Sequence, residues 1–373
     1  MSDYIWRCDL LPQYEAHKSA VTEAIERVLA SGRYMLSTEV KSFESEFAEY
    51  ADTDHGVSVA SGTDGLILSL LALGIGRGDE VITTPFTAIP TLSAIVATGA
   101  TPVFVDICGD TYLMDIEKVG GVLTKHSKAI VPVHLFGNMV DIAALREALP
   151  AGFPIVEDAC QAHGSMLHGR KAGVVGDCGV FSFYPTKNLG GYGDGGIVIT
   201  SNEQLAESLL LLRMYGMTDP AHISSHGYNS RLDELQAAIL RAKLPHLDAM
   251  NEQRNIIAGR YRADLNPIMF EHQKIQDGCY SNYHILAARF TGDRQRLQDH
   301  LEKMGVQTNV YYPLPLHLQK ANAYLGLGEG SFPVAEALCK EIVALPMYAE
   351  LPEDKLDRVI DAINTAVVMP SSA

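Results

Sequence analysis

The sequence predicts an α/β fold with a mostly parallel sheet flanked by helices, followed by a smaller α+β region. Two observations carry this prediction. Between about residues 56 and 200, short β-branched or apolar runs alternate with longer helix-like segments, which is typical of repeated β–α–β units. After residue 200 the pattern changes to long amphipathic helical segments with few strands.

Five short β-branched or apolar runs are expected to be strands buried on both faces: residues 56–60, 80–84, 102–106, 129–133 and 154–157. Two further strands are expected at 180–183 and 196–200. The helices expected between them are 64–73, 89–98 and 142–149. Further helices are expected at 21–29, 203–215, 232–263, 294–304, 333–342 and 353–366, with one strand at 283–290.

The length of 373 residues suggests two domains at about 150 residues each. We expect an N-terminal segment, 1–35, that packs on the smaller domain or on a partner. A large domain is expected at 36–245 and a small C-terminal domain at 246–373.

Charge and cysteine content exclude several classes of partner. With 29 Lys and Arg against 45 Asp and Glu, the net charge is −16, which repels nucleic acid and anionic lipid surfaces. An anionic ligand would therefore need local groups to hold it. The six cysteines include no CxxC pair, so neither a disulfide framework nor a metal site is expected. Without a signal-peptide pattern or an apolar run long enough for a membrane span, the expected location is the cytoplasm.

A Ser-Gly-Thr-Asp-Gly run at residues 61–65 follows the first expected strand and opens an apolar helix. Small residues there leave backbone N–H groups free at the positive end of the helix, where an anion can bind. The hydroxyls of Ser61 and Thr63 add donors. The alternative is an ordinary N-cap, with Thr63 or Asp64 capping the helix.

An aspartate and a lysine follow two later strands. Asp158 ends the apolar strand at 154–157, and the carboxyl ends of strands are where open α/β sheets place ligand groups. The alternative for Asp158 is to cap the next turn. Lys187 lies between an aromatic strand and a glycine-rich loop. Most lysines are solvated surface residues, but a cleft there would desolvate the amine and favour covalent chemistry with a carbonyl.

The glycines at 191–196 match G-x-G-x-x-G, yet they do not predict a nicotinamide site. A dinucleotide fingerprint follows a strand and opens a helix, whereas this run leads into the expected strand at 196–200. We expect these glycines to let the backbone pass close to a bulky group.

Together these features are what pyridoxal phosphate requires. The helix start at 61–65 would hold the phosphate, and Phe86 offers an aromatic ring for stacking. Asp158 would keep the pyridine nitrogen protonated, and Lys187 would bind the cofactor covalently. The sequence therefore predicts pyridoxal 5′-phosphate as the cofactor.

At this point the chain resembles the DegT/DnrJ/EryC1/StrS family of sugar aminotransferases, within the fold-type I aspartate aminotransferase superfamily. The matching runs include SGTDGLILSLLALGIGRGDEVI, VEDACQAHGS, SFYPTKNLGGYGDGGIV and GYNSRLDELQAAIL. The resemblance covers nearly the whole chain and implies a fold-type I pyridoxal-phosphate-dependent transferase, with 36–245 as the cofactor-binding domain. It also implies a homodimer with active sites at the subunit interface.

The resemblance assigns roles position by position. Lys187 looks like the catalytic lysine and proton shuttle, and Asp158 like the partner of the pyridinium nitrogen. The residues expected to bind the cofactor are Gly62, Thr63, Asp64, Phe86, Asp158, Gln161, Ser182, Lys187 and, reaching from the partner subunit, Asn229. A branch of the family that dehydrates sugars has histidine at the lysine position, so Lys187 favours transamination.

Three further residues are candidates for substrate contact: His163, Tyr312 and His317. The resemblance places residues 311–317 near the sugar or its diphosphate. The alternatives are a packed histidine at 163 and a proline-stiffened domain connection at 311–317.

The expected reaction moves an amino group from an amino acid, glutamate being the expected donor, to a keto-sugar on a nucleotide diphosphate. Gln161 resembles the branch acting at C3, since several relatives acting at C4 carry histidine there, so a 3-keto sugar is expected. The alternatives are a C4-keto nucleotide sugar, a cyclitol ketone, and a non-catalytic regulator that keeps the fold.

Overall fold

A central sheet positions most of the predicted site. The computed structural model describes residues 4–368; the outer ends of the two predicted terminal segments, 1–3 and 369–373, lie outside the described residues. The strands of this sheet are β1 (His55–Val59), β2 (Glu80–Thr83), β3 (Thr101–Phe104), β4 (Ser127–Ile130), β5 (Val156–Asp158), β8 (Cys178–Ser182) and β9 (Gly196–Thr200). They correspond to the seven runs that the sequence predicts.

The sheet has the order β3-β2-β4-β5-β8-β9-β1. Its two halves, β3-β2-β4 and β5-β8-β9-β1, meet where Asp158 N donates to Pro132 O at 2.9 Å and Ile130 N donates to Pro154 O at 3.0 Å. All neighbours run parallel except β9, which is antiparallel to both β8 and β1. The prediction of a mostly parallel sheet is confirmed.

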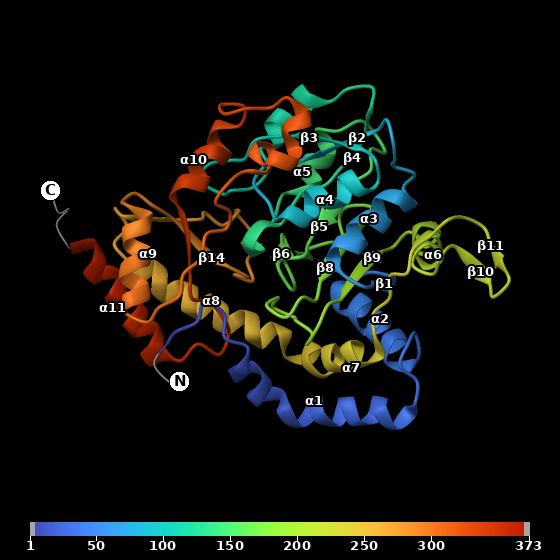
Figure 1. Ribbon diagram of the computed structural model, residues 1–373, viewed down its shortest axis with the longest axis horizontal. Helices are drawn as coiled ribbons and strands as arrows, with labels where there is room; N and C mark the ends of the chain where they lie inside the picture. Colours follow the sequence, from blue (N-terminus) through green and yellow to red (C-terminus); the bar gives the residue numbers. More distant parts are fainter. Residues whose placement is uncertain (1–3, 369–373) are drawn as a thin grey trace.

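Successive residues of β8 and β9 point into different clusters, which explains why these runs are apolar throughout. Val180 and Val198 pack in one buried cluster with α3 (Gly62–Ala72) and α6 (Glu203–Leu212). Phe181 and Ile197 pack in another with α2 (Thr38–Ala51) and α7 (Glu234–Lys243). Because side chains alternate across a strand, both faces of the sheet are covered by helices (Figure 1).

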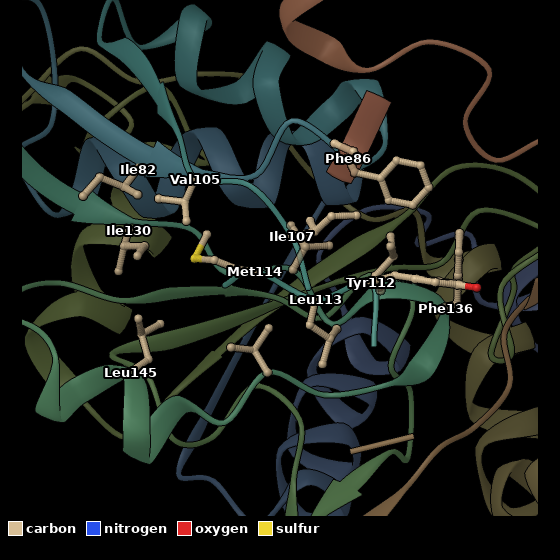
Figure 2. Close-up of a cluster of buried hydrophobic side chains, with 14 of the residues drawn as sticks. Ile82, Phe86, Val105, Ile107, Tyr112, Leu113, Met114, Ile130, Phe136 and Leu145 are labelled. Carbon is tan, nitrogen blue, oxygen red and sulfur yellow. The ribbon is translucent and has the colours of Figure 1, made fainter. Parts of the chain in front are cut away.

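A third cluster lies around β2 and β4, whereas side chains of α4 (Ile89–Ala97) pack in the cluster of α3 and in a smaller one. The third cluster involves α5 (Ile142–Glu147) and α10 (Pro333–Glu341). Figure 2 shows Phe86 and Phe136 at one end of this cluster, with Ile130 and Leu145 at the other. That end with Phe86 adjoins the carboxyl edge of the sheet.

A smaller antiparallel sheet, β12-β14-β15, forms a second centre. Its strands are β12 (Phe270–His272), β14 (Leu286–Phe290) and β15 (Ile342–Leu345). Side chains of α8 (Leu247–Asp264), α9 (Arg294–Lys303) and α11 (Glu353–Val368) share one buried cluster with it. Ile5 joins this cluster and pairs with Val306, so the start of the chain packs beside residues near its end.

Two expectations about the helices are wrong in detail. The single helix expected at 232–263 is two helices, α7 and α8, separated by a 3₁₀ turn at Leu244–His246 that contains Pro245. Proline cannot donate to the helical ladder, and its ring clashes with the preceding turn. The N-terminal helix, α1 (Leu11–Ser31), is longer than expected at 21–29 and packs along α7 (Figure 1).

The remaining elements are short and peripheral. A hairpin of β10 (Met217–Asp219) and β11 (His222–Ile223) projects beside α6 in Figure 1. A small sheet combines β6 (Met166–Leu167), β7 (Arg170–Lys171) and β13 (Cys279–Tyr280). The 3₁₀ helices besides Leu244–His246 are Ile116–Val122, Leu135–Gly137, Leu316–Leu318 and Lys320–Leu325. Across residues 4–368, none of the helices combines the length and apolar character that crossing a bilayer requires.

Candidate active site

The carboxyl edge of the large sheet brings three predicted segments together. Val59 at the end of β1 and Ser182 at the end of β8 both pair with Gly196 at the start of β9. Asp158, which ends β5, pairs with Val180 of the neighbouring strand β8. The segments that follow β1, β5 and β8 therefore start side by side.

Glycine is required where these segments approach each other most closely. A Cβ atom at Gly62 would lie 2.8 Å from the Ser182 Cβ and 2.8 Å from the Cys160 Sγ. One at Gly196 would lie 2.5 Å from the carbonyl carbon of Ser61. Because real Cβ atoms do not approach so closely, these positions keep the start of α3 pressed against β8 and β9. This contact brings Ser182 next to the start of α3.

The first turn of α3 has the features of an anion site. Ser61 is the N-cap, and its Oγ accepts a hydrogen bond from Asp64 N at 3.1 Å. The Asp64 carboxylate accepts from the hydroxyl of buried Ser230 at 2.6 Å, which anchors it to a segment far along the chain. Thr63 makes no side-chain hydrogen bond with other residues of the described chain, so its hydroxyl is free for a ligand. The cap and the anion site predicted as alternatives thus coexist, with Ser61 rather than Thr63 or Asp64 as the cap.

Asp158 is held from two sides and lacks a cationic partner. It is buried; its Oδ2 accepts from Thr91 Oγ1 at 2.7 Å and its Oδ1 from Cys160 N at 3.2 Å. Thr91 Oγ1 lies 3.1 Å from Thr87 Oγ1. No Lys, Arg or His of residues 4–368 forms an ion pair with Asp158. A buried carboxylate without a counter-charge fits a protonated heterocyclic nitrogen.

Lys187 follows β8 in a tight turn, where its N–H donates to Tyr184 O at 2.8 Å. Burial lowers the pKa of its amine, and the nearby charge of Arg7 lowers it further, while Cys160 and Asp158 oppose these two effects. A lowered amine pKa is what covalent carbonyl chemistry and proton transfer require near neutral pH.

Phe86, Gln161 and Tyr312 form the aromatic side of the site. Gln161 Oε1 accepts from Phe136 N at 2.8 Å, which fixes the amide orientation, and its Nε2 donates to the Tyr312 hydroxyl at 3.1 Å. The Tyr312 ring packs edge-on against Phe86 with centroids 5.7 Å apart. The structure thus joins two predicted cofactor residues to one predicted substrate residue.

The two histidines occupy packed positions. His163 is 1% exposed and lies against Phe181 and Phe183, with ring centroids 5.2 and 5.9 Å away. Burial lowers its pKa to about 3, with a further contribution from Lys187. His317 is also 1% exposed, and its Nε2 lies 3.0 Å from Glu336 Oε1. The placement of His163 fits its alternative, a packed histidine, while substrate contact by His317 stays a prediction.

Asn229 is exposed, and among the described residues its side chain makes no hydrogen bond. Its neighbour Ser230 is buried and bonds to Asp64 of the same chain. The pair therefore points in two directions: Ser230 points to the first turn of α3 in its own chain, and Asn229 points outward.

Three residues of the site are absent from the sequence-based prediction: Arg7, Thr91 and Ser230. Thr91 has no motif of its own, although Thr87 and Thr91 are four residues apart and share one face of α4 and its entry. Arg7 and Ser230 act on partners remote in sequence, so no local pattern signals them.

A family model of the DegT/DnrJ/EryC1/StrS aminotransferase family matches residues 15–364. A curated relative, "dTDP-3-amino-3,4,6-trideoxy-alpha-D-glucose transaminase" of Micromonospora megalomicea subsp. nigra, is 42% identical over 98% of this chain and 99% of its own length. Another, "Pleiotropic regulatory protein" of Geobacillus stearothermophilus, is also 42% identical, over 95% of this chain and 96% of its own.

Solved structures agree with these matches. DesV of S. venezuelae, in complex with a ketimine intermediate, superposes with a TM-score of 0.96 at 41% identity, over 99% of this chain and 100% of DesV. The ntda protein of Bacillus subtilis, with bound cofactor pmp, gives a TM-score of 0.88 at 30% identity, over 95% of this chain and 82% of its own.

Proposed function

Because the chain belongs to the DegT/DnrJ/EryC1/StrS aminotransferase family, we propose that it aminates a 3-keto sugar carried on a nucleoside diphosphate. The observation that carries this proposal is the convergence of Asp158, Lys187 and the first turn of α3 at one edge of the sheet. The amino donor proposed is an amino acid, with glutamate expected.

The cofactor is pyridoxal phosphate, and the residues present fit it. The α3 start, with the free hydroxyl of Thr63 and with Ser182 beside Gly62, would hold the phosphate. Asp158 would face the pyridine nitrogen, while Phe86 and Gln161 would contact the ring. When bound, the cofactor supplies an electron sink for the carbon that bears the migrating nitrogen.

Lys187 then has two tasks in this proposal. Its amine would bind the cofactor covalently, and the free amine would accept the proton from the donor Cα and later return it. Its lowered pKa supports this role, because more of the amine is unprotonated near neutral pH. Asp158 would support it by keeping the ring nitrogen protonated.

The choice of C3 rests on Gln161 and on one relative. Its amide does not titrate, in contrast to a histidine at this place, and its orientation is fixed by Phe136 N. The Micromonospora relative is named for a 3-amino sugar on thymidine diphosphate. A deoxythymidine or uridine diphosphate is therefore the proposed carrier, and a homodimer that completes each site through Asn229 is the proposed assembly.

A non-catalytic regulator is the second candidate, since a relative of equal identity is named as a regulatory protein. The unpaired buried carboxylate of Asp158 and the desolvated amine of Lys187 argue for catalysis. A regulator that binds no cofactor has no use for a buried carboxylate without an ion-pair partner, which costs stability.

The test is NMR analysis of products from glutamate with 3-keto and 4-keto nucleotide sugars, each supplied separately. We expect an amino group at C3 of the sugar and formation of 2-oxoglutarate. Amination at C4 only, or only of a cyclitol ketone, would overturn the substrate proposal. No amination of any ketone, together with no spectral change on adding glutamate, would support the regulator.

A further inference from the structure

The segment before α1 fixes one arginine at the rim of the site. Ile5 N donates to Gly305 O at 2.7 Å, and Gln307 N donates to Ile5 O at 2.9 Å. Two residues on, Arg7 N donates to Gln307 Oε1 at 3.0 Å and Arg7 O accepts from Met347 N at 2.9 Å. The backbone of Arg7 is therefore tied to the small sheet region on both sides.

The Arg7 side chain extends from this anchor toward the aromatic side of the site. Its guanidinium carbon lies 5.2 Å from the centroid of the Tyr311 ring, a cation–π distance. Tyr311 packs edge-on against Tyr312 at 5.9 Å, and Tyr312 is the residue whose hydroxyl meets Gln161. Arg7 is thus two aromatic side chains away from a predicted cofactor residue.

The same cation acts electrostatically on Lys187. The charge of Arg7 contributes to lowering the pKa of Lys187 and of His284, in both cases after burial and, for His284, after other charges. The His284 ring lies 3.1 Å from the side-chain oxygen of Asn188, the residue next to Lys187. Arg7 therefore adds positive charge to the surroundings of Lys187.

No carboxylate neutralises this cation. Within residues 4–368, the Arg7 guanidinium takes part in no ion pair and no side-chain hydrogen bond. Nearby Arg254 is buried and donates only to backbone carbonyls, so it adds positive charge rather than cancelling it. The chain as a whole has a net charge of −16, so an unpaired arginine at the rim of the site makes the local charge positive where the overall charge is negative.

We propose that Arg7 binds the anionic group of a substrate in front of Lys187. The inference rests on the proposed function, in which both substrates are anions: the amino acid has carboxylates and the sugar nucleotide has a diphosphate. A planar guanidinium suits either group, because it donates two parallel hydrogen bonds to carboxylate or phosphate oxygens. The Tyr311 ring, in contact with the guanidinium, helps to hold that group in place.

The test compares Arg7→Gln, Arg7→Lys and a matched control, Arg77→Gln, which makes the same charge change at an exposed arginine. The two half-reactions are followed separately by the cofactor spectrum in single turnovers, one with glutamate and one with the keto-sugar nucleotide. We expect Arg7→Gln to raise the half-saturating concentration of one substrate by about 10- to 100-fold. Arg7→Lys should recover part of it, and Arg77→Gln should stay within about 2-fold of wild type.

A binding measurement without turnover makes the same comparison and identifies the source of the anion. Calorimetry with glutarate, a dicarboxylate without an amino or keto group, reports the donor side, and thymidine diphosphate reports the sugar side. A selective loss of glutarate affinity in Arg7→Gln assigns Arg7 to the carboxylate, and a selective loss of thymidine diphosphate affinity assigns it to the diphosphate. Arg7→Gln indistinguishable from Arg77→Gln with both ligands would overturn the inference.

These outcomes remain separable from a failure of the proposed function. If wild-type protein aminates no keto-sugar, the proposed function fails, while the glutarate and nucleotide measurements still decide whether Arg7 binds an anion. Thermal unfolding of the three variants, with Arg7→Lys keeping the side-chain stem, separates loss of binding from loss of fold.

Discussion

Asp158 shows how one hydrogen-bond chain orients a group on which the chemistry depends. An ionised carboxylate only accepts, so Thr91 must donate to Asp158 at 2.7 Å. The Thr91 oxygen is then free to accept, and Thr87 donates to it at 3.1 Å. The hydrogen bonds from Thr87 to Thr91 and from Thr91 to Asp158 thus hold the carboxylate in place for the ring nitrogen.

Replacing Thr91 by valine removes this donor at nearly constant volume. Because hydrogen bonds to charged groups contribute about 1.5–3 kcal/mol, we expect a 10- to 100-fold fall in the single-turnover rate with glutamate. Thr91→Ser should restore most of the rate. The affinity of the apoenzyme for pyridoxamine phosphate, measured by fluorescence, should weaken in Thr91→Val and recover in Thr91→Ser. Equal rates in all three proteins would show that Asp158 needs no help from α4.

His163 gives a pH-dependent prediction. Its pKa is lowered from 6.5 to about 3 in the folded protein, so between these values the unfolded chain binds a proton that the folded chain does not. Stability that is complete above pH 6.5 is therefore lost as the pH falls toward 3, by up to about 1.4 kcal/mol per pH unit. His163→Leu should flatten this acid slope in urea unfolding and keep transaminase activity within a few-fold. An unchanged slope, or a selective loss of substrate saturation, would contradict the packing role.

The residues that sequence alone could predict are those with local signals. Lys187 and Asp158 stand at strand ends within recognisable runs, so their chemistry could be inferred without coordinates. Thr91 could not, because its partner Asp158 is 67 residues away and a threonine near the start of a helix has many ordinary uses. Arg7 could not either, since only the folded chain brings the N-terminal segment to the rim of the site.

At the scale of elements, α2 shows why one helix was not predicted. Its cap comes from another helix: Glu234 of α7 accepts from Ser37 N at 2.7 Å, Glu39 N at 2.9 Å and Val40 N at 3.0 Å. The Ser37 side chain makes no cap bond itself. Ser37 and Thr38 are residues typical of a helix start, but the hydrogen bonds that cap α2 come from about 195 residues away in sequence, so only the folded chain shows them.

Glu234→Gln tests this capping between helices. The variant removes the negative charge that interacts favourably with the positive end of α2, and it weakens three hydrogen bonds. We therefore expect a loss of about 1–3 kcal/mol in unfolding free energy. The control is Glu26→Gln, an exposed carboxylate on α1 that makes no hydrogen bond or ion pair within the described chain. It should change the urea midpoint by little. Similar midpoints for both variants would mean that α2 is stabilised by packing of Phe43 and Phe47 alone.

The strands were easier to predict than this helix, because each is a continuous apolar run that must be buried on both faces. The fate of residues 232–263 illustrates the opposite case. Their amphipathic period runs through Pro245, whose missing N–H interrupts the helical hydrogen bonds between α7 and α8.

At the scale of the whole molecule, the proposed homodimer connects two sites through adjacent residues. Ser230 bonds to Asp64 in its own chain, whereas exposed Asn229 is proposed to reach the partner's phosphate. The division of the chain at 35/36 and 245/246 likewise remains a prediction. The assembly cannot be read from one chain, because the contacts that define it lie between copies.

Mixing Asn229→Ala with Lys187→Ala subunits tests the shared site. If Asn229 serves the partner's site, each heterodimer has one site with both defects and one with neither, so activity should partly recover. Each variant alone is the control, and Lys187→Ala alone should be inactive. Absence of recovery, with heterodimers demonstrated by differently tagged subunits, would mean that each site is built within one chain.

The most direct test of the account is to locate the covalent link to the cofactor. Purified protein is reduced with borohydride, digested, and mapped by mass spectrometry for the phosphopyridoxyl group. The account predicts the group on Lys187 and its absence from Lys187→Ala. Lys243, whose pKa burial lowers to about 8, is the natural competitor. Labelling of Lys243, or of any lysine other than Lys187, would contradict the assignment of the catalytic centre.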